Sequence, residues 1–397
     1  RWRQSLVGNN AAANALRQIG VEVFPSFPIT PSTEIPEYFS KYIAEGKILS
    51  NLILVESEHS AMSAAIGSVL SNARTATATS SNGLAYMWEM LHIASSMRAP
   101  IIMELVCRSI SGPLNIHNDH SDAMGMKDTG WIILFSKNNQ DVYDNTIIGT
   151  MIAENSNVLL PIVICQDGFI TSHSIENIEI LEDDEVTKLV GKYNNNNVNL
   201  LDKENPVTVG PLDLPTHLFE HKRLQVEALA NAKKVFKEVS EKYEKISGRK
   251  INMIDTYMVE DAEIVIIAIG STAETIEEVV DRRRKNGEKV GVIAIRMFRP
   301  FPEEEIISAL KNVKNIAVMD KVMDYSLNGG PLYKEIISAI YDMKEKEKNN
   351  DKDKNIIVSN YIYGIGGRNI GVDDIEGIFE DILDGSNNEK IKYVGLK

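Results

Sequence analysis

Residues 100–109, PIIMELVCRS, contain the stretch that decides the fold. Its first seven residues are almost continuously apolar, which predicts a short strand buried on both faces. Such strands belong to parallel sheets that carry helices on both sides. The strand ends at Cys107, Arg108 and Ser109, which would lie at the carboxyl edge of the sheet, where open parallel sheets bind their ligands.

Around this strand, extended and helical patterns alternate, which is typical of a parallel α/β sheet. Strands are predicted at residues 21–27, 51–55, 74–79 and 160–165, the second of them apolar enough to be buried. Helices are predicted at residues 11–19, 34–43, 57–73, 84–96 and 141–154. This first α/β unit is expected to end near residue 175.

The sequence after this unit changes in composition. Residues 176–250 are polar and irregular, with an Asn run at 194–197 and a long charged helix at 224–247. A second α/β pattern begins at residue 251, with strands AEIVIIAIG, KVGVIAIRMF and KNIAVMD. We therefore predict an α/β protein with two parallel-sheet three-layer domains, residues 1–250, including the excursion at about 176–250, and residues 251–397.

Composition excludes several classes of protein. Of the 397 residues, 42 are Lys or Arg and 56 are Asp or Glu, and this net charge of −14 argues against binding to nucleic acid or an anionic membrane. Two cysteines cannot build a disulfide framework or an iron–sulfur cluster, which needs four thiolates. Neither a membrane-spanning run nor a secretion signal is visible, so we expect a cytoplasmic protein.

Four polar clusters follow predicted strands of the first unit: FPITP at 27–31, ESEHS at 56–60, TSSNG at 79–83, and CRS at 107–109 leading into GPLNIHNDHSD. Taken singly, each has a structural explanation, such as a helix cap, a helix-dipole partner, a loop or an ion pair. Their convergence on one sheet edge instead favours a site. A hydroxyl and a guanidinium could hold a small carboxylate, and a carboxyl could hydrogen-bond a cofactor nitrogen.

Other motifs are weaker. No Ser/His/Asp order, P-loop or GxGxxG is present, and the GIGG at residues 364–367 lacks the dinucleotide spacing, so we interpret it as a turn. His117 and His120 could suggest a metal. We interpret them as hydrogen-bonding groups of a loop, because no third ligand with suitable geometry lies nearby in the sequence.

Several longer blocks resemble the alpha subunit of pyruvate:ferredoxin oxidoreductase. The resemblance spans nearly the whole chain, and RSISGPLNIHNDHSDAMGMKDTGW at residues 108–131 is its most specific part. The other blocks are PITP at 28–31, ESEHSAMSAAIG at 56–67, TATSSNGL at 77–84, NQDVYD at 139–144, LLPIVICQDGFITSHS at 159–174, RMFRPFP at 296–302, SLNGGPLYKE at 326–335 and YGIGGRNI at 363–370.

This resemblance implies a thiamine-diphosphate-binding domain of the pyrimidine type, followed by a domain like the C-terminal domain of transketolase. The enzyme would cleave a 2-oxoacid oxidatively with coenzyme A. By the same resemblance, Thr30 and Arg108 bind the substrate carboxylate and Pro28 lies on the thiamine side. Glu58 contacts the pyrimidine ring nitrogen, favouring the imino tautomer of the ring. Glu56, two residues earlier, is a rival that fits the spacing of the pattern less well.

The resemblance also implies partner subunits. A beta subunit would carry the Mg²⁺–diphosphate site and a [4Fe-4S] cluster, beside gamma and ferredoxin-like delta subunits or fused equivalents, with ferredoxin as electron acceptor. The residues support this division independently, because the chain has two cysteines and no clear G-D-G motif for a metal–diphosphate group. A self-sufficient thiamine decarboxylase or transketolase is disfavoured for the same reason.

The choice of substrate remains open between pyruvate and a branched-chain 2-oxoacid such as 2-ketoisovalerate. NIHNDHSD resembles pyruvate enzymes more than 2-oxoglutarate enzymes, and Thr30 argues against an oxalate enzyme. The chain departs from the family at Phe27, where a tyrosine is common, and in its Asn-rich insertion. A non-catalytic structural subunit is the competing class, but it would not need Thr30, Glu58 and Arg108 together.

Overall fold

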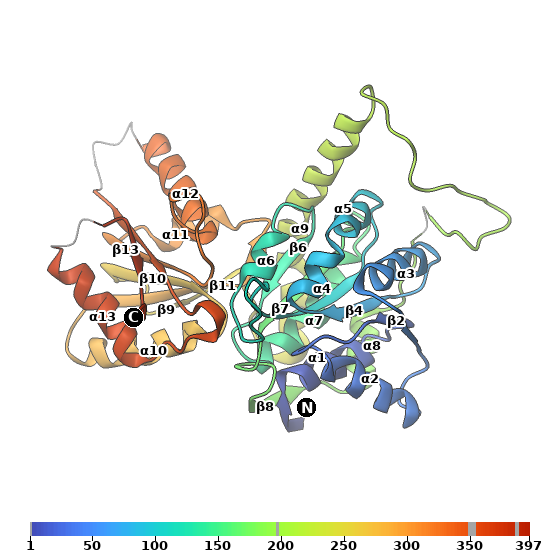
Figure 1. Ribbon diagram of the computed structural model, residues 1–397, viewed down its shortest axis with the longest axis horizontal. Coiled ribbons are helices and arrows are strands. Elements are labelled where there is room, and N and C mark those ends of the chain that lie inside the picture. Colours follow the sequence, from blue (N-terminus) through green and yellow to red (C-terminus); the bar gives the residue numbers. More distant parts are fainter. Residues whose placement is uncertain (1, 196–197, 348–354, 386–388) are drawn as a thin grey trace.

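The computed structural model describes residues 2–195, 198–347, 355–385 and 389–397, and its two sheets lie side by side (Figure 1). The first sheet has the order β12-β6-β7-β5-β4 and is parallel except for β12, which runs antiparallel to β6. Its strands are β4 (Ala76–Thr79), β5 (Ile102–Cys107), β6 (Ile132–Phe135), β7 (Ile162–Asp167) and β12 (Met297–Arg299). A parallel pair, β2 (Val23–Ser26) and β3 (Asn51–Leu54), continues it through a bridge between Val23 and Thr75.

Strand β5 is buried on both faces, as its apolar run predicts. Met103 and Leu105 pack in one hydrophobic cluster, and Ile102 and Val106 pack in another on the opposite face. The second cluster is formed with α1 (Gly8–Gln18), α2 (Glu34–Ala44), α7 (Asn139–Ala153) and α9 (Leu218–Ser247). The first cluster is formed with α3 (Glu58–Leu70), α4 (Ser81–Tyr86), α5 (Trp88–Ser96) and α6 (Ser121–Gly125). The first domain therefore has three layers.

The second sheet has the order β15-β14-β13-β10-β11-β9 and is parallel except for β9, which runs antiparallel to β11. Its strands are β9 (Ile254–Tyr257), β10 (Ile264–Ile269), β11 (Val290–Ile295), β13 (Asn315–Asp320), β14 (Ile357–Ile362) and β15 (Ile391–Tyr393). Helices α10 (Thr272–Lys285) and α13 (Val372–Asp384) pack on one face, and α11 (Glu303–Ala309) and α12 (Pro331–Glu347) on the other. This unit is also three-layered, so the predicted fold class is confirmed.

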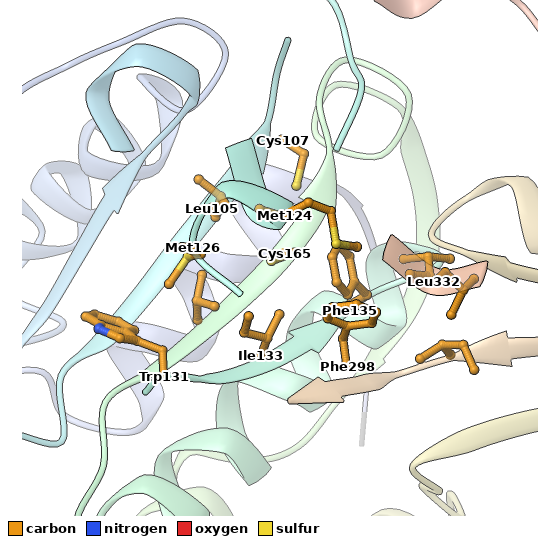
Figure 2. Close-up of a cluster of buried hydrophobic side chains, with 14 of the residues drawn as sticks. Leu105, Cys107, Met124, Met126, Trp131, Ile133, Phe135, Cys165, Phe298 and Leu332 are labelled. Atoms are coloured by element: carbon orange, nitrogen blue, oxygen red, sulfur yellow. The ribbon is translucent and has the colours of Figure 1, made fainter. Parts of the chain in front are cut away.

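The two units share one hydrophobic core. Figure 2 shows Phe135 and Ile133 of the first sheet beside Phe298 and Leu332 from the second half of the chain. The rings of Phe135 and Phe298 meet edge to face, with 6.2 Å between their centroids. Continuous burial of this kind fixes one domain against the other.

Three local predictions were wrong. The predicted strand KVGVIAIRMF is split, because its last residues form β12 and cross to the first sheet. Strand β3 is not buried: among the described residues it pairs with β2 alone, and Leu54 is 73% exposed. Residues 176–190 are not irregular, since β8 (Ile175–Ile180) pairs with β1 (Trp2–Val7) and is followed by α8 (Asp183–Val190).

Several element bounds also shift. The predicted helix at residues 84–96 is interrupted at Met87 between α4 and α5, and α9 begins at Leu218 instead of residue 224. Asn196 and Asn197 of the Asn-rich run lie outside the described residues, and the division of the chain at residue 250 stays a prediction. Among the described residues, no helix is both long enough and apolar enough to cross a membrane.

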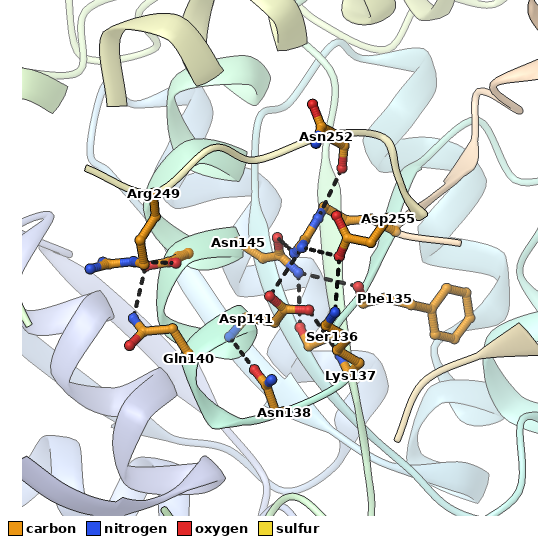
Figure 3. A network of polar contacts seen from close by, with 12 residues as sticks. Phe135, Ser136, Lys137, Asn138, Gln140, Asp141, Asn145, Arg249, Asn252 and Asp255 are labelled. Carbon is orange, nitrogen blue, oxygen red and sulfur yellow. Dashed lines mark hydrogen bonds and ion pairs between the residues drawn. The ribbon is translucent and has the colours of Figure 1, made fainter. Parts of the chain in front are cut away.

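Arg296, between β11 and β12, anchors the junction of the two units. Its side chain is buried and donates to Asp141 Oδ1 at 3.0 Å and to Asp255 Oδ2 at 2.8 Å. It also donates to Asn145 Oδ1 at 2.8 Å and to the carbonyl of Asn252 at 3.0 Å. Figure 3 shows these four partners converging from helix α7 and from the segment that enters the second sheet.

Candidate active site

Glu58 is the first residue of α3, directly after the loop that follows β3. The Ser57 side chain caps this helix by accepting the backbone N–H of Ser60 at 3.2 Å. The Glu58 side chain is nearly buried, and the carboxylate makes no hydrogen bond or ion pair with any residue that the structure describes. The side chain lies against Gly83: a Cβ atom added to this glycine would lie 2.8 Å from Glu58 Oε1. A buried carboxylate without a partner is expected to receive one from a ligand.

Glu56, the rival position, is placed differently. It is exposed, and the hydroxyl of Ser60 donates a hydrogen bond to its carboxylate. This hydrogen bond lowers the pKa of Glu56. Glu56 therefore has a partner at the start of the helix, whereas Glu58 has none.

Buried hydroxyl groups without partners gather at the ends of β2 and β4. Ser26 is the last residue of β2, Thr79 is the last residue of β4, and Ser80 follows it; none of their hydroxyls has a hydrogen-bond partner among the described residues. The order β3-β2-β4-β5-β7-β6 reverses its direction between β2 and β4. Such a reversal opens a crevice at the carboxyl edge of a sheet, where ligands bind. Thr79 and Ser80 belong to the TSSNG cluster, but neither was predicted from the sequence as a binding or catalytic residue.

Arg108 is the residue directly after β5. Its side chain is buried, with Nη1 donating to the carbonyl of Thr30 at 2.9 Å and Nε to the carbonyl of Asn115 at 3.1 Å. The guanidinium forms no ion pair with a carboxylate among the described residues. Burial lowers the pKa of Arg108, and the charge of Asp122 opposes this only in part. The general expectation that such an arginine serves a structural ion pair is therefore not met.

Thr30 and Pro28 lie on the loop between β2 and α2. Both residues are exposed, and the Thr30 hydroxyl makes no hydrogen bond within the described part of the chain. The fold thus brings Thr30 and Arg108 together through a direct hydrogen bond. No such bond joins either of them to Glu58, which lies against Gly83 instead.

Asp122 links the part of the site around Arg108 to the part around Gly83. It was not predicted from the sequence as a site residue. Its Oδ2 accepts the backbone N–H groups of Arg108 and Ser81, each at 2.9 Å, and its Oδ1 accepts that of Ala123 at 2.7 Å. Burial raises the pKa of Asp122 to about 7, although these three N–H groups pull it down. The carboxyl group therefore ties the end of β5 to the start of α4, the helix that carries Gly83.

The two histidines of the HNDH sequence lie beside this site. His120 is buried, and its Nε2 lies 2.7 Å from Asp167 Oδ1, while the His117 ring lies beside Phe169 at 5.4 Å between centroids. Over the described ranges, no three His, Cys, Asp or Glu side chains are grouped so that they could hold a metal ion.

Two three-layer α/β units, the first with a reversal of strand order, define a class of two-domain α/β proteins whose sheets bind ligands where the strand order reverses. Two family models match the chain: pyruvate flavodoxin/ferredoxin oxidoreductase, thiamine-diphosphate-binding, over residues 14–241, and pyruvate:ferredoxin oxidoreductase core domain II over residues 262–375. The chain therefore belongs to the pyruvate:ferredoxin oxidoreductase family, as the alpha-type subunit of a thiamine-diphosphate-dependent oxidoreductase.

Curated relatives match along their whole length. Pyruvate synthase subunit PorA of Thermotoga maritima is 45% identical, over 100% of this chain and 98% of the relative. The protein of the same name from Methanocaldococcus jannaschii is 40% identical, over 99% and 97%. Ketoisovalerate oxidoreductase subunit VorA of Pyrococcus horikoshii is 38% identical, over 98% and 97%.

Solved structures share the fold. A 2-oxoglutarate:ferredoxin oxidoreductase from Magnetococcus marinus matches with a TM-score of 0.70 and 18% identity, over 96% of this chain. The present chain spans 65% of the length of that protein chain. A split-gene transketolase matches with a TM-score of 0.53 and 9% identity, over 96% of this chain and 99% of the other.

Proposed function

We propose that this chain binds the substrate carboxylate in an enzyme that oxidatively decarboxylates pyruvate with coenzyme A, yielding acetyl-CoA and CO₂. The observation that carries the proposal is the buried guanidinium of Arg108, which has two backbone carbonyl partners and no carboxylate partner among the described residues. A guanidinium binds a carboxylate through paired hydrogen bonds. The exposed hydroxyl of Thr30, on the residue that Arg108 contacts, supplies a further donor.

The crevice between β2 and β4 fits the aminopyrimidine of thiamine diphosphate. That ring carries both donors and acceptors, and the crevice offers the unpartnered hydroxyls of Ser26, Thr79 and Ser80. Glu58 would hold a proton at the pyrimidine ring nitrogen, and Pro28 would lie on the thiamine side. When bound, the cofactor supplies the carbanion chemistry that amino-acid side chains lack.

Partner subunits complete this assignment. Both cysteines, Cys107 and Cys165, are buried in the core, and a cluster needs four thiolates. We therefore assign the Mg²⁺–diphosphate site and a [4Fe-4S] cluster to a beta subunit, and further electron transfer to gamma and delta subunits and ferredoxin. The word "subunit" in the names of the relatives supports a complex of this kind. A cytoplasmic location stays a prediction.

An exposed apolar arm also supports partner subunits. Residues 198–217, before α9, extend away from the body of the molecule (Figure 1), and Leu201 and Leu212 among them are 71% and 90% exposed. Phe219, at the start of α9, is 79% exposed. Apolar side chains that gather on a surface mark a contact with another protein. We propose that a partner subunit covers this arm.

Two alternatives stay open to test. The relative named ketoisovalerate oxidoreductase favours a branched-chain 2-oxoacid as substrate, since it is as similar to this chain as several pyruvate synthase subunits are. A non-catalytic subunit is disfavoured by Arg108 and Glu58, because two buried charged groups without an oppositely charged partner among the described residues would destabilise a subunit that binds no ligand there.

The deciding experiment is reconstitution with partner subunits, followed by kcat/KM for pyruvate and 2-ketoisovalerate with coenzyme A and ferredoxin. We expect pyruvate to be preferred, iron to be bound only in the assembled complex, and the isolated chain to be colourless and to bind thiamine diphosphate poorly. A preference for 2-ketoisovalerate would establish the first alternative. No turnover of either acid by a complex loaded with cofactor would establish the second. Stoichiometric iron on the folded, isolated chain would contradict the division among subunits.

A further inference from the structure

The GIGG turn at residues 364–367 follows β14 of the second sheet and lies against the loop at residues 115–119 of the first domain. Three hydrogen bonds join the two segments: Asn115 Nδ2 to the carbonyl of Gly366 at 3.0 Å, the N–H of Gly366 to Asp119 Oδ2 at 3.1 Å, and the N–H of Gly367 to the carbonyl of Asn118 at 2.8 Å. From its sequence this motif is predicted to be a turn with no part in the site.

Two of the glycines are required by this close approach. Gly366 and Gly367 have φ angles of +61° and +77°, a region that other residues rarely adopt. A Cβ atom on Gly367 would lie 2.3 Å from His117 Cβ, and one on Gly366 would lie 2.7 Å from Asn115 Nδ2. Because a Cβ atom moves only with its own backbone, a side chain on Gly367 would displace the loop itself.

The same loop surrounds Arg108. The carbonyl of Asn115 accepts Arg108 Nε at 3.1 Å, and Asn118 Nδ2 donates to the carbonyl of Cys107, the preceding residue, at 3.0 Å. The N–H of Ser109, the following residue, donates to the carbonyl of His117 at 2.9 Å. Asn115 thus contacts the guanidinium through its backbone and the GIGG turn through its side chain.

We propose that the GIGG turn is a positioning element of the substrate site: it holds the loop so that the Asn115 carbonyl orients the Arg108 guanidinium toward the 2-oxoacid carboxylate. The inference rests on the proposed function, in which Arg108 binds that carboxylate. Asn115, Gly366 and Gly367 are positioning residues, since they act through Arg108. If the contacts served domain packing alone, breaking them would alter assembly and stability without selectively affecting substrate binding.

The first test compares Gly367→Ala with Gly287→Ala in the assembled complex. Gly287 also has a positive φ of +84°, but no heavy atom lies within 4 Å of the position of its Cβ, so it controls for backbone strain alone. We expect the KM for the 2-oxoacid to rise about tenfold in Gly367→Ala, because small misplacements of a binding group are costly. The kcat and the exchange rate of the thiazolium C2 proton should stay unchanged, and Gly287→Ala should match the parent in KM, kcat and exchange rate.

A second variant avoids any clash. Asn115→Ala keeps the backbone carbonyl that accepts Arg108 Nε and removes the side-chain bond to the turn, together with the bond in which Asn115 Oδ1 accepts the N–H of His117 at 2.7 Å. The loss of these two hydrogen bonds should raise KM by about threefold to tenfold. If Gly367→Ala fails to fold or assemble, Asn115→Ala replaces it in the experiment that follows.

A double-mutant cycle with Arg108→Lys decides between positioning and packing. If the turn acts through the guanidinium, Gly367→Ala should change KM less than about twofold in the Arg108→Lys background. Equal effects in both backgrounds, or a Gly367→Ala variant indistinguishable from Gly287→Ala, would overturn the positioning role. In that case a raised KM in Arg108→Lys alone would leave the proposed function standing. A normal KM in Arg108→Lys would overturn both.

Discussion

Arg108 and Arg296 are both buried arginines directly after a parallel strand, and their surroundings are opposite. Arg296 donates to two carboxylates, an amide oxygen and a backbone carbonyl. Arg108 donates to two backbone carbonyls and has no carboxylate partner among the described residues. Burial alone would lower the pKa of either group, but Asp141 and Asp255 raise the pKa of Arg296, whereas the pKa of Arg108 stays lowered.

The difference teaches how to separate a structural charge from a binding charge. A buried ion is tolerated when the protein itself compensates it, as around Arg296. An uncompensated one costs folding free energy, so it persists where a ligand supplies the missing charge. Glu58 belongs with Arg108 in this respect, since its carboxylate also has no partner in the described part of the chain.

The largest expected effect comes from Glu58→Gln in the assembled complex. If Glu58 holds a proton at the pyrimidine ring nitrogen, the variant should fold and assemble but react roughly 10²–10⁴-fold more slowly. The measurement is exchange of the thiazolium C2 proton, which requires neither substrate nor clusters. Glu56→Gln is the matched control, because it makes the same charge change at an exposed position.

Slow exchange in Glu58→Gln with normal exchange in Glu56→Gln supports the assignment. The reverse pattern would transfer the role to Glu56. Normal exchange in both variants would remove both carboxylates from this step and would leave the unpartnered state of Glu58 without a functional reason.

The next largest effect is expected for Arg296, whose charge is compensated by two carboxylates. Arg296→Met leaves the buried Asp141 and the half-buried Asp255 without their shared arginine, which should destabilise the protein by about 3–5 kcal/mol. Urea unfolding of the assembled complex measures this loss, and the KM of the folded fraction should be unchanged. Arg3→Met, which removes an exposed pair with Glu179, should cost less than about 1 kcal/mol. Equal stability of Arg296→Met and the parent would contradict the structural role of Arg296 on which the comparison with Arg108 depends.

A smaller effect in free energy than for Glu58 or Arg296 is expected for Arg108, the arginine proposed to bind the substrate. Arg108→Lys replaces a planar fork with a point charge, so it should weaken carboxylate binding by roughly 1.5–3 kcal/mol, a rise in KM of about tenfold to a hundredfold. Its unfolding midpoint should stay near that of the parent, because no protein ion pair is lost. Kinetics near those of the parent would place Arg108 outside the substrate site.

The sequence by itself determined the fold class, the alternating elements and the four polar clusters, because apolar runs and strand ends are local features. It also carried the family resemblance that named Thr30, Glu58 and Arg108. Local patterns predicted the wrong structure where the pairing partner is distant in sequence. KVGVIAIRMF has the pattern of one strand, but its last residues form β12 and pair with β6, more than 150 residues earlier. Residues 176–190 are polar in sequence because β8 carries Glu176, Asn177 and Glu179 at positions that are exposed or partly exposed.

Only the tertiary structure decided which charged groups are compensated. Arg108 and Arg296 both follow apolar strands in the sequence, and nothing local distinguishes them. The carboxylates of Asp141 and Asp255 reach Arg296 from opposite sides of the domain junction. Asp122, which accepts the N–H of Arg108, also accepts that of Ser81 in α4, 41 residues earlier. The GIGG turn meets the Asn115 loop across 251 residues. Electrostatic compensation depends on distance in space, and this distance is set by how the two sheets pack.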